Sequence, residues 1–312
     1  MNARTRLLFA TLVILVTVGR AVSFEAALSV VQGTGKGRAD TAPMRVPAPV
    51  SFREVRGRGL IVRTWINSVG PFNFAIDTGA GATLLSQRVA DEARVAMTKG
   101  RSSIAGLSGN SISARHASLQ SVAIGDSDNY LPARGDAMVI SGLPPDLDGV
   151  LDPTEVFSPL GYVLDLPQNE LSAFDPKTSP IRMNEQPDQG TVVPWIREAS
   201  SRRPFVMLDN GDRALLDTGS SLGLAIRDSG SSNREARRDA VRDVGGGQIS
   251  SRRVEATTVS IGALTLRRVP TDLVSGTEAD APVLLGLSAL RPFRLRFDPL
   301  HRLIEIAPGR RY

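Results

Sequence analysis

Short apolar runs separated by Gly, Pro and Asn turns dominate the chain after residue 45. Many have the length and the β-branched content of strands, at 60–66, 72–76, 122–125, 137–140, 162–165, 205–208, 214–216, 259–262, 295–298 and 303–306. Ser86 is expected to be the N-cap of a short helix over 87–95, and the Arg-rich stretch 231–244 is predicted to hold a second helix. The pattern predicts a mainly β protein with a few short helices.

The N-terminus follows a different pattern. Arg4 and Arg6 precede an apolar run at 7–18, and small residues follow it. The run is too short to span a bilayer comfortably, so this order predicts a secretory signal peptide over 1–23. We therefore expect an exported protein, either periplasmic or secreted, with an uncleaved membrane anchor as the alternative.

One pattern occurs twice: an apolar strand that runs directly into Asp-Thr-Gly. Asp77-Thr78-Gly79 ends the run at 72–76, and Asp217-Thr218-Gly219 ends the run at 214–216. Further landmarks follow each copy in the same order and at similar intervals, namely Gly125 and Gly262, Asp152 and Gly286, and Asp165 and Asp298. Internal duplication explains this order, and it predicts two pseudo-symmetric lobes.

The duplication also predicts the domain boundaries. The lobes are expected at 45–178 and 191–308, with a Pro-rich interlobe linker at 179–190. Residues 24–44 contain many Gly and Pro and weak periodicity, so we interpret them as a linker or a propeptide.

A duplicated domain can bring one Asp from each half to the same place. Two carboxylates about 3 Å apart cannot both ionise readily, so such a pair would hold one proton. The ionised member can then take a proton from water while the protonated member polarises a peptide carbonyl. Asp77 and Asp217 are therefore the candidate catalytic residues.

These motifs resemble those of a known family. Asp77-Thr78-Gly79-Ala80 and Asp217-Thr218-Gly219-Ser220 resemble the paired active-site motifs of aspartic proteases, and Leu284-Leu285-Gly286 resembles the second signature of that family. The layout is similar to single-chain, two-lobed bacterial members of the retropepsin-like and pepsin-like group. The resemblance implies two pseudo-symmetric β-barrel lobes. It also implies that Thr78, Gly79, Thr218 and Gly219 support the active-site loops.

Two Gly-rich hairpins are the candidate substrate flaps. They lie near 102–113 and 245–251, with Gly106, Gly109, Gly246 and Gly247 at their tips. The resemblance implies that they cover a peptide held in extended form. Neither contains a Tyr, which is closer to the retropepsin pattern than to the pepsin pattern.

Composition narrows the possible partners. The chain has no Cys and two His, which excludes disulfides and Cys-ligated metal sites, so we expect no metal and no cofactor. The net charge of +5 comes from scattered Arg residues, so no nucleic-acid partner is expected. We expect a monomer that acts on a peptide or protein substrate, with no membrane contact beyond the signal peptide.

Two alternatives remain open from sequence alone. Asp152 stands where the second half has Gly286, so the fold could be a catalytically weak or inactive peptide-binding module. Separately, residues 219–223 match the G-x-S-x-G nucleophile pattern around Ser221, with His301 later in the chain, as in α/β-hydrolases.

Overall fold

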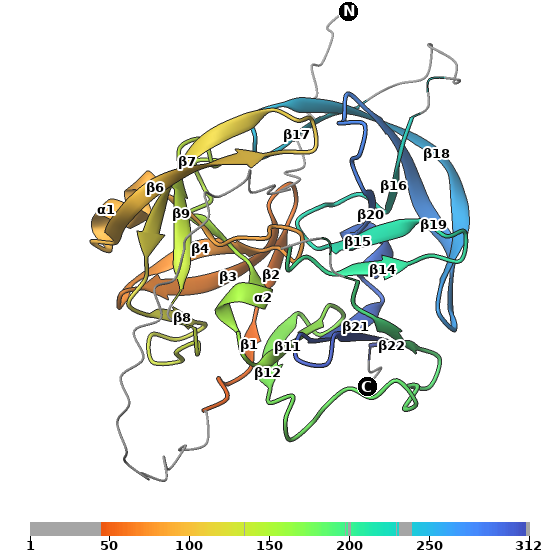
Figure 1. Cartoon of the computed structure of the whole chain (residues 1–312), viewed down its shortest axis with the longest axis horizontal. Coiled ribbons are helices and arrows are strands. Elements are labelled where there is room, and N and C mark those ends of the chain that lie inside the picture. The colour runs from red at the N-terminus through yellow and green to blue at the C-terminus, as the bar shows by residue number, and fades with distance from the viewer. Residues whose placement is uncertain are drawn as a thin grey trace, which may run out of the picture.

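The computed structural model describes residues 45–133, 135–196, 198, 201–228, 230 and 239–309. Within these ranges the chain forms strands β1 to β22 and three short helices (Figure 1). The mainly β architecture predicted from the sequence is confirmed. No helix in the described part of the chain is long and apolar enough to cross a membrane.

The first half builds one large sheet. Its strand order is β2-β3-β4-β10-β5-β9-β7-β6, and β8 pairs with β3 at the side. The strands are β2 (Arg53–Val55), β3 (Gly59–Ile66), β4 (Val69–Ile76), β5 (Leu84–Ser86), β6 (Ala96–Ala105), β7 (Ser111–Ser118), β8 (Val122–Ile124), β9 (Asp136–Ile140) and β10 (Gly149–Leu151).

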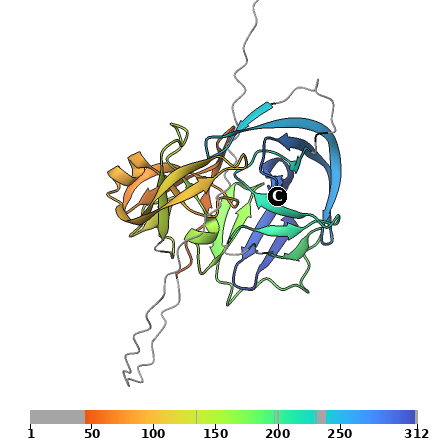
Figure 2. The ribbon, with the colours of Figure 1, turned by 45° about the horizontal axis from the view of Figure 1, so that its top comes forward.

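The second half repeats this sheet. Its order is β14-β15-β20-β16-β19-β18-β17, which matches β3-β4-β10-β5-β9-β7-β6 strand for strand. The strands are β14 (Phe205–Met207), β15 (Arg213–Asp217), β16 (Leu224–Arg227), β17 (Asp239–Arg242), β18 (Gln248–Ile261), β19 (Leu264–Ser275) and β20 (Val283–Gly286). The two halves lie side by side in Figure 2. The sequence repeat is therefore also a repeat of topology.

A third sheet joins the halves. Its order is β1-β12-β11-β21-β22-β13, so three strands from each half meet where β11 pairs antiparallel with β21. The strands are β1 (Val50–Ser51), β11 (Gly161–Asp165), β12 (Glu170–Phe174), β13 (Thr191–Pro194), β21 (Phe293–Asp298) and β22 (Leu303–Pro308). Residues 179–190, the predicted linker, run between β12 and β13. Among the described strands, none of the three sheets closes into a barrel.

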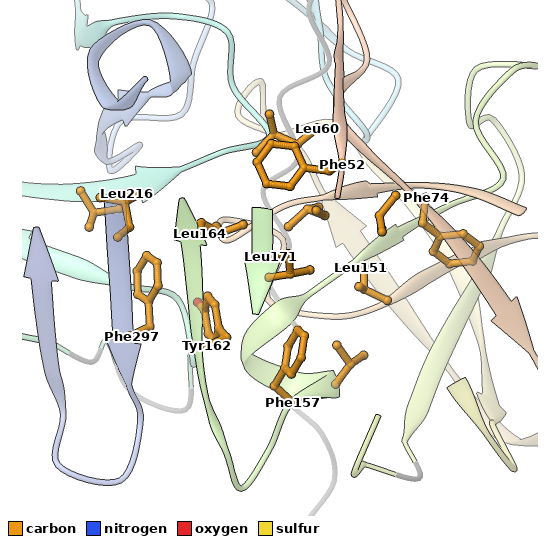
Figure 3. Close-up of a cluster of buried hydrophobic side chains, with 14 of the residues drawn as sticks. Phe52, Leu60, Phe74, Leu151, Phe157, Tyr162, Leu164, Leu171, Leu216 and Phe297 are labelled. Atoms are coloured by element: carbon orange, nitrogen blue, oxygen red, sulfur yellow. The ribbon is translucent and has the colours of Figure 1, made fainter. Parts of the chain in front are cut away.

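The main core packs against this shared sheet and contains side chains from both halves (Figure 3). Tyr162 is fully buried, and its ring stacks on Phe297 with the ring centroids 4.6 Å apart. Leu151, which precedes Asp152, and Leu216, which precedes Asp217, belong to the same cluster. Burying such side chains stabilises each by about 1.5–3 kcal/mol relative to exposure. The core therefore supports the loops that carry the Asp-Thr-Gly triplets.

The helices agree with the sequence in one place and differ in others. α1 (Gln87–Glu92) begins after Ser86, whose side chain accepts a hydrogen bond from the Val89 N–H at 3.2 Å, as predicted. α2 (Pro153–Val156) and α3 (Leu287–Leu290) were not predicted, because a single turn shows no periodicity. The predicted helix over 231–244 is wrong where it can be checked. Residues 239–242 form strand β17, and 231–238 lie outside the described residues.

Candidate active site

Each Asp-Thr-Gly triplet lies at the end of a central, buried strand. β4 runs into Asp77, and β15 ends at Asp217. The residues just before each Asp, Ile76 and Leu216, are fully buried, so the strands cannot shift outward without exposing core. Both triplets thus emerge from the core at equivalent points.

The two threonines bind the triplets together. The Thr78 N–H donates to Thr218 Oγ1 at 3.1 Å, and the Thr218 N–H donates to Thr78 Oγ1 at 3.1 Å. Each hydroxyl in turn donates to a carbonyl of the other half. Thr78 Oγ1 bonds the Leu216 oxygen at 2.6 Å, and Thr218 Oγ1 bonds the Ile76 oxygen at 3.1 Å. This buried, reciprocal network holds the two loops in one arrangement.

The two glycines allow the carboxyl groups to approach one another. A Cβ on Gly79 would lie 2.8 Å from Asp217 Oδ1, and a Cβ on Gly219 would lie 2.3 Å from Asp77 Oδ2. Each glycine N–H also donates to the Oδ1 of its own triplet's Asp, at 2.7 Å for Gly79 and 2.9 Å for Gly219. Any larger residue would push the opposite carboxyl group away.

The structure brings Asp77 and Asp217 together. Both are fully buried and within hydrogen-bonding reach of each other. The Oδ2 atom of each is buried and has no hydrogen-bond partner among the described residues. A proton shared between the carboxyl groups satisfies both atoms.

Burial raises the pKa of both carboxyl groups. For Asp77, burial, followed by the negative charge of Asp217, raises the pKa well above its usual range. For Asp217, burial raises the pKa to about 6. The pair titrates as one unit.

The two predicted flap hairpins meet over the site. They are β6–β7 and β17–β18, which arch toward each other in Figures 1 and 2. A Cβ on Gly106 would lie 2.1 Å from the Asp243 carboxyl carbon, and a Cβ on Gly247 would lie 1.9 Å from Ser108 Oγ. Both glycines thus lie where the tips touch. A Cβ on Gly109 would meet Glu278, whereas a Cβ on Gly246 would meet nothing within 4 Å.

Each hairpin tip places a side chain in the hydrophobic core of the opposite half. Leu107, from the first hairpin, packs in the core cluster of the second half, and Val244, from the second hairpin, packs in that of the first half. Asp243 is buried and accepts hydrogen bonds from the Ser108 N–H at 2.8 Å and the Gly247 N–H at 2.9 Å. Asp243 was not among the residues predicted for the site, and the one signal for it in the sequence is its place shortly before Gly245-Gly246-Gly247.

A cavity of about 590 Å³ opens beside the second triplet. Gly219 and Leu222 of the active-site loop form one wall, and Val241 of the β17–β18 hairpin forms another. Arg253 and Asp272, which are paired at 2.9 Å, also line it. The cavity has the size of a pocket for side chains of a bound molecule. No group of three or more His, Asp or Glu within the described ranges is arranged to hold a metal ion.

Asp152 occupies the position that the sequence repeat assigned to it. Leu151 lies opposite Ile76, and the Asp77 N–H donates to the Leu151 carbonyl at 3.0 Å. Asp152, the residue after Leu151, therefore lies next to Asp77, in the same way as Gly286 lies opposite Asp217. The Asp152 side chain is buried, and burial raises its pKa to about 7. The two halves of the site thus differ in charge.

The α/β-hydrolase interpretation of Ser221 is contradicted by the fold. That fold requires strand–helix alternation around a mainly parallel sheet, whereas the described part of this chain has mostly antiparallel pairing and helices of six residues or fewer. His301 lies in the β21–β22 turn, and its Nδ1 contacts Asp298 Oδ2 at 2.8 Å. His116 lies on β7 and contacts Ser102 Oγ at 2.7 Å.

Comparison with known proteins agrees with the first half of this geometry. Residues 62–151 match the family described as Aspartyl protease, a stretch that runs from β3 through Asp77 to the end of β10. No curated protein matches the chain significantly. The match supports an aspartic-protease-like domain over residues 62–151 and a protease-like function of the hydrolase class.

Proposed function

We propose that this protein is an exported aspartic endopeptidase that hydrolyses peptide bonds with a water molecule activated between Asp77 and Asp217. The observation that carries the proposal is the reciprocal arrangement of the two triplets. Two carboxyl groups, one from each half, are buried next to each other, and the hydrogen bonds between Thr78 and Thr218 hold them in this arrangement.

A pair that shares one proton supplies a general base and a general acid at the same place. The ionised carboxyl group takes a proton from water as the water oxygen bonds to the peptide carbonyl carbon, and the protonated carboxyl group donates its proton to the carbonyl oxygen, which gives a tetrahedral diol. The first carboxyl group then passes its proton to the leaving nitrogen as the C–N bond breaks, and the second recovers a proton from the diol. Protons and electrons balance without any cofactor.

The flap hairpins and the cavity supply the binding site. A peptide in extended form can pair with the strand edges under β6–β7 and β17–β18 and place a side chain in the cavity beside Gly219. Because the tips touch each other through Asp243 and Ser108, they must separate for a peptide to enter. We infer an enzyme with a gated cleft, which acts on flexible or unfolded segments.

A second function is a peptide-binding module of the same fold without effective catalysis. The observation that favours it is the buried carboxyl group of Asp152 beside Asp77. An additional negative charge there could hold the pair in an unproductive protonation state.

Cleavage of a peptide library separates the two functions. The full chain and its Asp217→Asn variant are incubated with the library from about pH 3 to 8, and products are read by mass spectrometry. Cleavage by the wild type that Asp217→Asn abolishes supports the endopeptidase. Binding of peptides without cleavage across the range supports the module. Asp209→Asn, which removes an exposed carboxylate in the β14–β15 turn, is the matched control that should cleave normally.

Export and a monomeric state are parts of the proposal with tests of their own. Residues 1–44, which contain the predicted signal peptide and linker, lie outside the described residues. N-terminal sequencing of the protein recovered from the extracytoplasmic fraction should begin after residue 23. Light scattering should give the mass of one chain, because both carboxyl groups come from the same chain.

A further inference from the structure

A buried charged residue, Asp272 of β19, lies in the second half of the molecule. The strand register fixes its place relative to the second triplet. Asp272 lies next to Ala225 of β16, and Ala225 pairs with Leu284 of β20. Leu284 in turn lies opposite Leu215, two residues before Asp217. The same chain of pairings can be followed in the first half, so the residue equivalent to Asp272 can be identified.

The equivalent position in the first half is occupied by Met138 of β9. Met138 lies next to Leu84 of β5, and Leu84 pairs with Val150 of β10. Val150 lies opposite Ala75, two residues before Asp77. Met138 is buried and belongs to a hydrophobic core cluster of the first half. One pseudo-symmetric position thus carries an apolar side chain in the first half and a carboxyl group in the second.

The surroundings of Asp272 also differ between the halves. Its Oδ1 accepts hydrogen bonds from two residues of β18, from Ser251 Oγ at 3.2 Å and from Arg253 Nε at 2.9 Å. By the same register, Ala114 takes the place of Ser251 in the first half. The second half therefore has a polar group of side chains where the first half has Ala114 and Met138.

One oxygen of Asp272 has no partner. The residue is 3% exposed, and its Oδ2 has no hydrogen-bond partner among the described residues. Arg253 binds the other oxygen through its Nε, and 58% of its side-chain surface is exposed. A buried carboxyl oxygen without a donor is costly, and native proteins seldom keep one without a reason. Asp272 therefore offers an acceptor that the folded chain itself does not use.

Asp272 lines the cavity of about 590 Å³ beside the second triplet. Gly219 of the triplet and Gly59 line the same cavity, and a Cβ on Gly59 would lie 3.7 Å from the Thr218 carbonyl oxygen. The cavity thus extends from the active-site loop to Asp272. A substrate whose cleaved bond lies at the carboxyl pair can therefore place a nearby side chain in this cavity.

The other charges along the cavity are paired or lie in solvent. Glu54 and Arg291 form a salt bridge with each other, in which Arg291 Nε donates to Glu54 Oε2 at 3.0 Å. Arg56 and Asp239 are exposed, so water screens their charges. Among the described residues that line the cavity, Asp272 alone is both charged and buried. A ligand in the cavity therefore meets a negative charge on its buried wall.

We propose, given the endopeptidase function above, that Asp272 is a specificity-determining residue that selects substrates with a lysine or arginine side chain close to the cleaved bond. The cationic side chain enters the cavity beside Gly219 and donates a hydrogen bond to Asp272 Oδ2. The exposed Arg253 side chain turns further into solvent to make room. Charge-assisted hydrogen bonds are among the strongest in proteins, and a site built to make one discriminates against substrates that lack the donor.

The cleavage pattern of a peptide library tests the proposal. Products of the wild type, read by mass spectrometry, should show Lys or Arg at one fixed position near the cleaved bond. Replacing that residue by norleucine in a single peptide should lower kcat/KM by about tenfold or more. Asp272→Met, which copies Met138, should abolish this preference and still cleave the norleucine peptide. Absence of the preference in a wild type that cleaves, or the same preference in Asp272→Met, would overturn the proposal.

Glu255→Gln is the matched control. It removes an exposed carboxylate of β18 and should retain the preference of the wild type. Asp272→Asn, which keeps the shape of the side chain and removes its charge, replaces Asp272→Met if that variant does not fold. It should lose the same preference.

A binding measurement separates this inference from the endopeptidase function. n-Propylguanidinium is the arginine side chain without a peptide bond, and its binding to the full chain can be followed by NMR. The backbone amide signals of residues 251–253 and 272 should shift in the wild type but not in Asp272→Met. Binding by a chain that cleaves no peptide would support the inference and contradict the endopeptidase. Cleavage without a basic preference and without binding would contradict this inference alone, and absence of both cleavage and binding would contradict both.

Discussion

Thr78 and Thr218 exchange hydrogen bonds across the boundary between the two halves, each hydroxyl oxygen accepting the other's backbone N–H at 3.1 Å. Both residues are buried, so no water competes for these bonds. The spacing between the carboxyl groups of Asp77 and Asp217 therefore depends on the threonines. A change that breaks these bonds should act on the carboxyl pair as well as on stability.

Thr78→Ala should remove a hydroxyl that both donates and accepts across the halves. The Thr218 N–H and the Leu216 carbonyl would lose their partner, which should lower the free energy of unfolding by roughly 1–3 kcal/mol. Activity should fall more than stability does, because the carboxyl groups lose their fixed spacing. Chemical denaturation and peptide cleavage measure the two effects. Thr78→Ser, which keeps the hydroxyl, should remain close to the wild type, and equal losses in both variants would contradict this role.

Gly219→Ala should disrupt the carboxyl pair directly. The new methyl group would lie 2.3 Å from Asp77 Oδ2, so the carboxyl group must move. We expect a loss of kcat of at least about a hundredfold, on the scale of removing one positioned catalytic group. Gly135→Ala is the matched control, since its Cβ would meet no atom within 4 Å. A fully active Gly219→Ala enzyme would show that catalysis does not require the close approach of the two carboxyl groups.

Asp243→Ala should loosen the contact between the flap tips. The Ser108 and Gly247 N–H groups would lose their acceptor, so the closed arrangement should open more often. Hydrogen–deuterium exchange should rise at 106–110 and 243–247, with little change in the shared sheet. Asp280→Ala removes an exposed carboxylate from a nearby loop and serves as the control. Unchanged hydrogen–deuterium exchange at both tips would show that Asp243 does not hold the flap tips together.

Stability should decrease as the pH rises from about 4 to 7. The folded protein holds protons on Asp77, Asp217 and Asp152 that the unfolded chain has already released, since the pKa of each is raised by burial. Each such group contributes a loss of about 1.4 kcal/mol per pH unit between its unfolded and folded pKa. Thermal unfolding at several pH values measures this slope. Asp152→Asn should flatten it, and a wild-type slope of the opposite sign would refute the assignment of these protons.

The sequence predicted the strands around both triplets well, for a physical reason. The apolar runs before Asp77 and Asp217 are central strands with no exposed face, so local pattern and tertiary packing agree there. The repeat also predicted that Asp152 and Gly286 are equivalent, and the pairing of Leu151 with Ile76 places them so. The hydrophobic pattern of the sequence therefore predicts the structure well at strands that are buried in the core.

The features that the sequence did not predict depend on contacts between distant segments. Residues 239–242 belong to an Arg-rich stretch that suggested a helix, but pairing with β18 makes them a strand. Asp243 matters because it meets Ser108 of the other hairpin, a contact that no local pattern encodes.

The pH dependence of kcat/KM for one cleaved peptide tests the central claim most directly. If Asp77 and Asp217 act as a pair with one proton, the wild type should show a bell-shaped profile, since activity is lost when the pair gains or loses a proton. Asp77→Asn and Asp217→Asn should each reduce kcat/KM by about a thousandfold or more at the optimum. A profile without an acid and an alkaline limb, or substantial cleavage by either variant, would contradict the account.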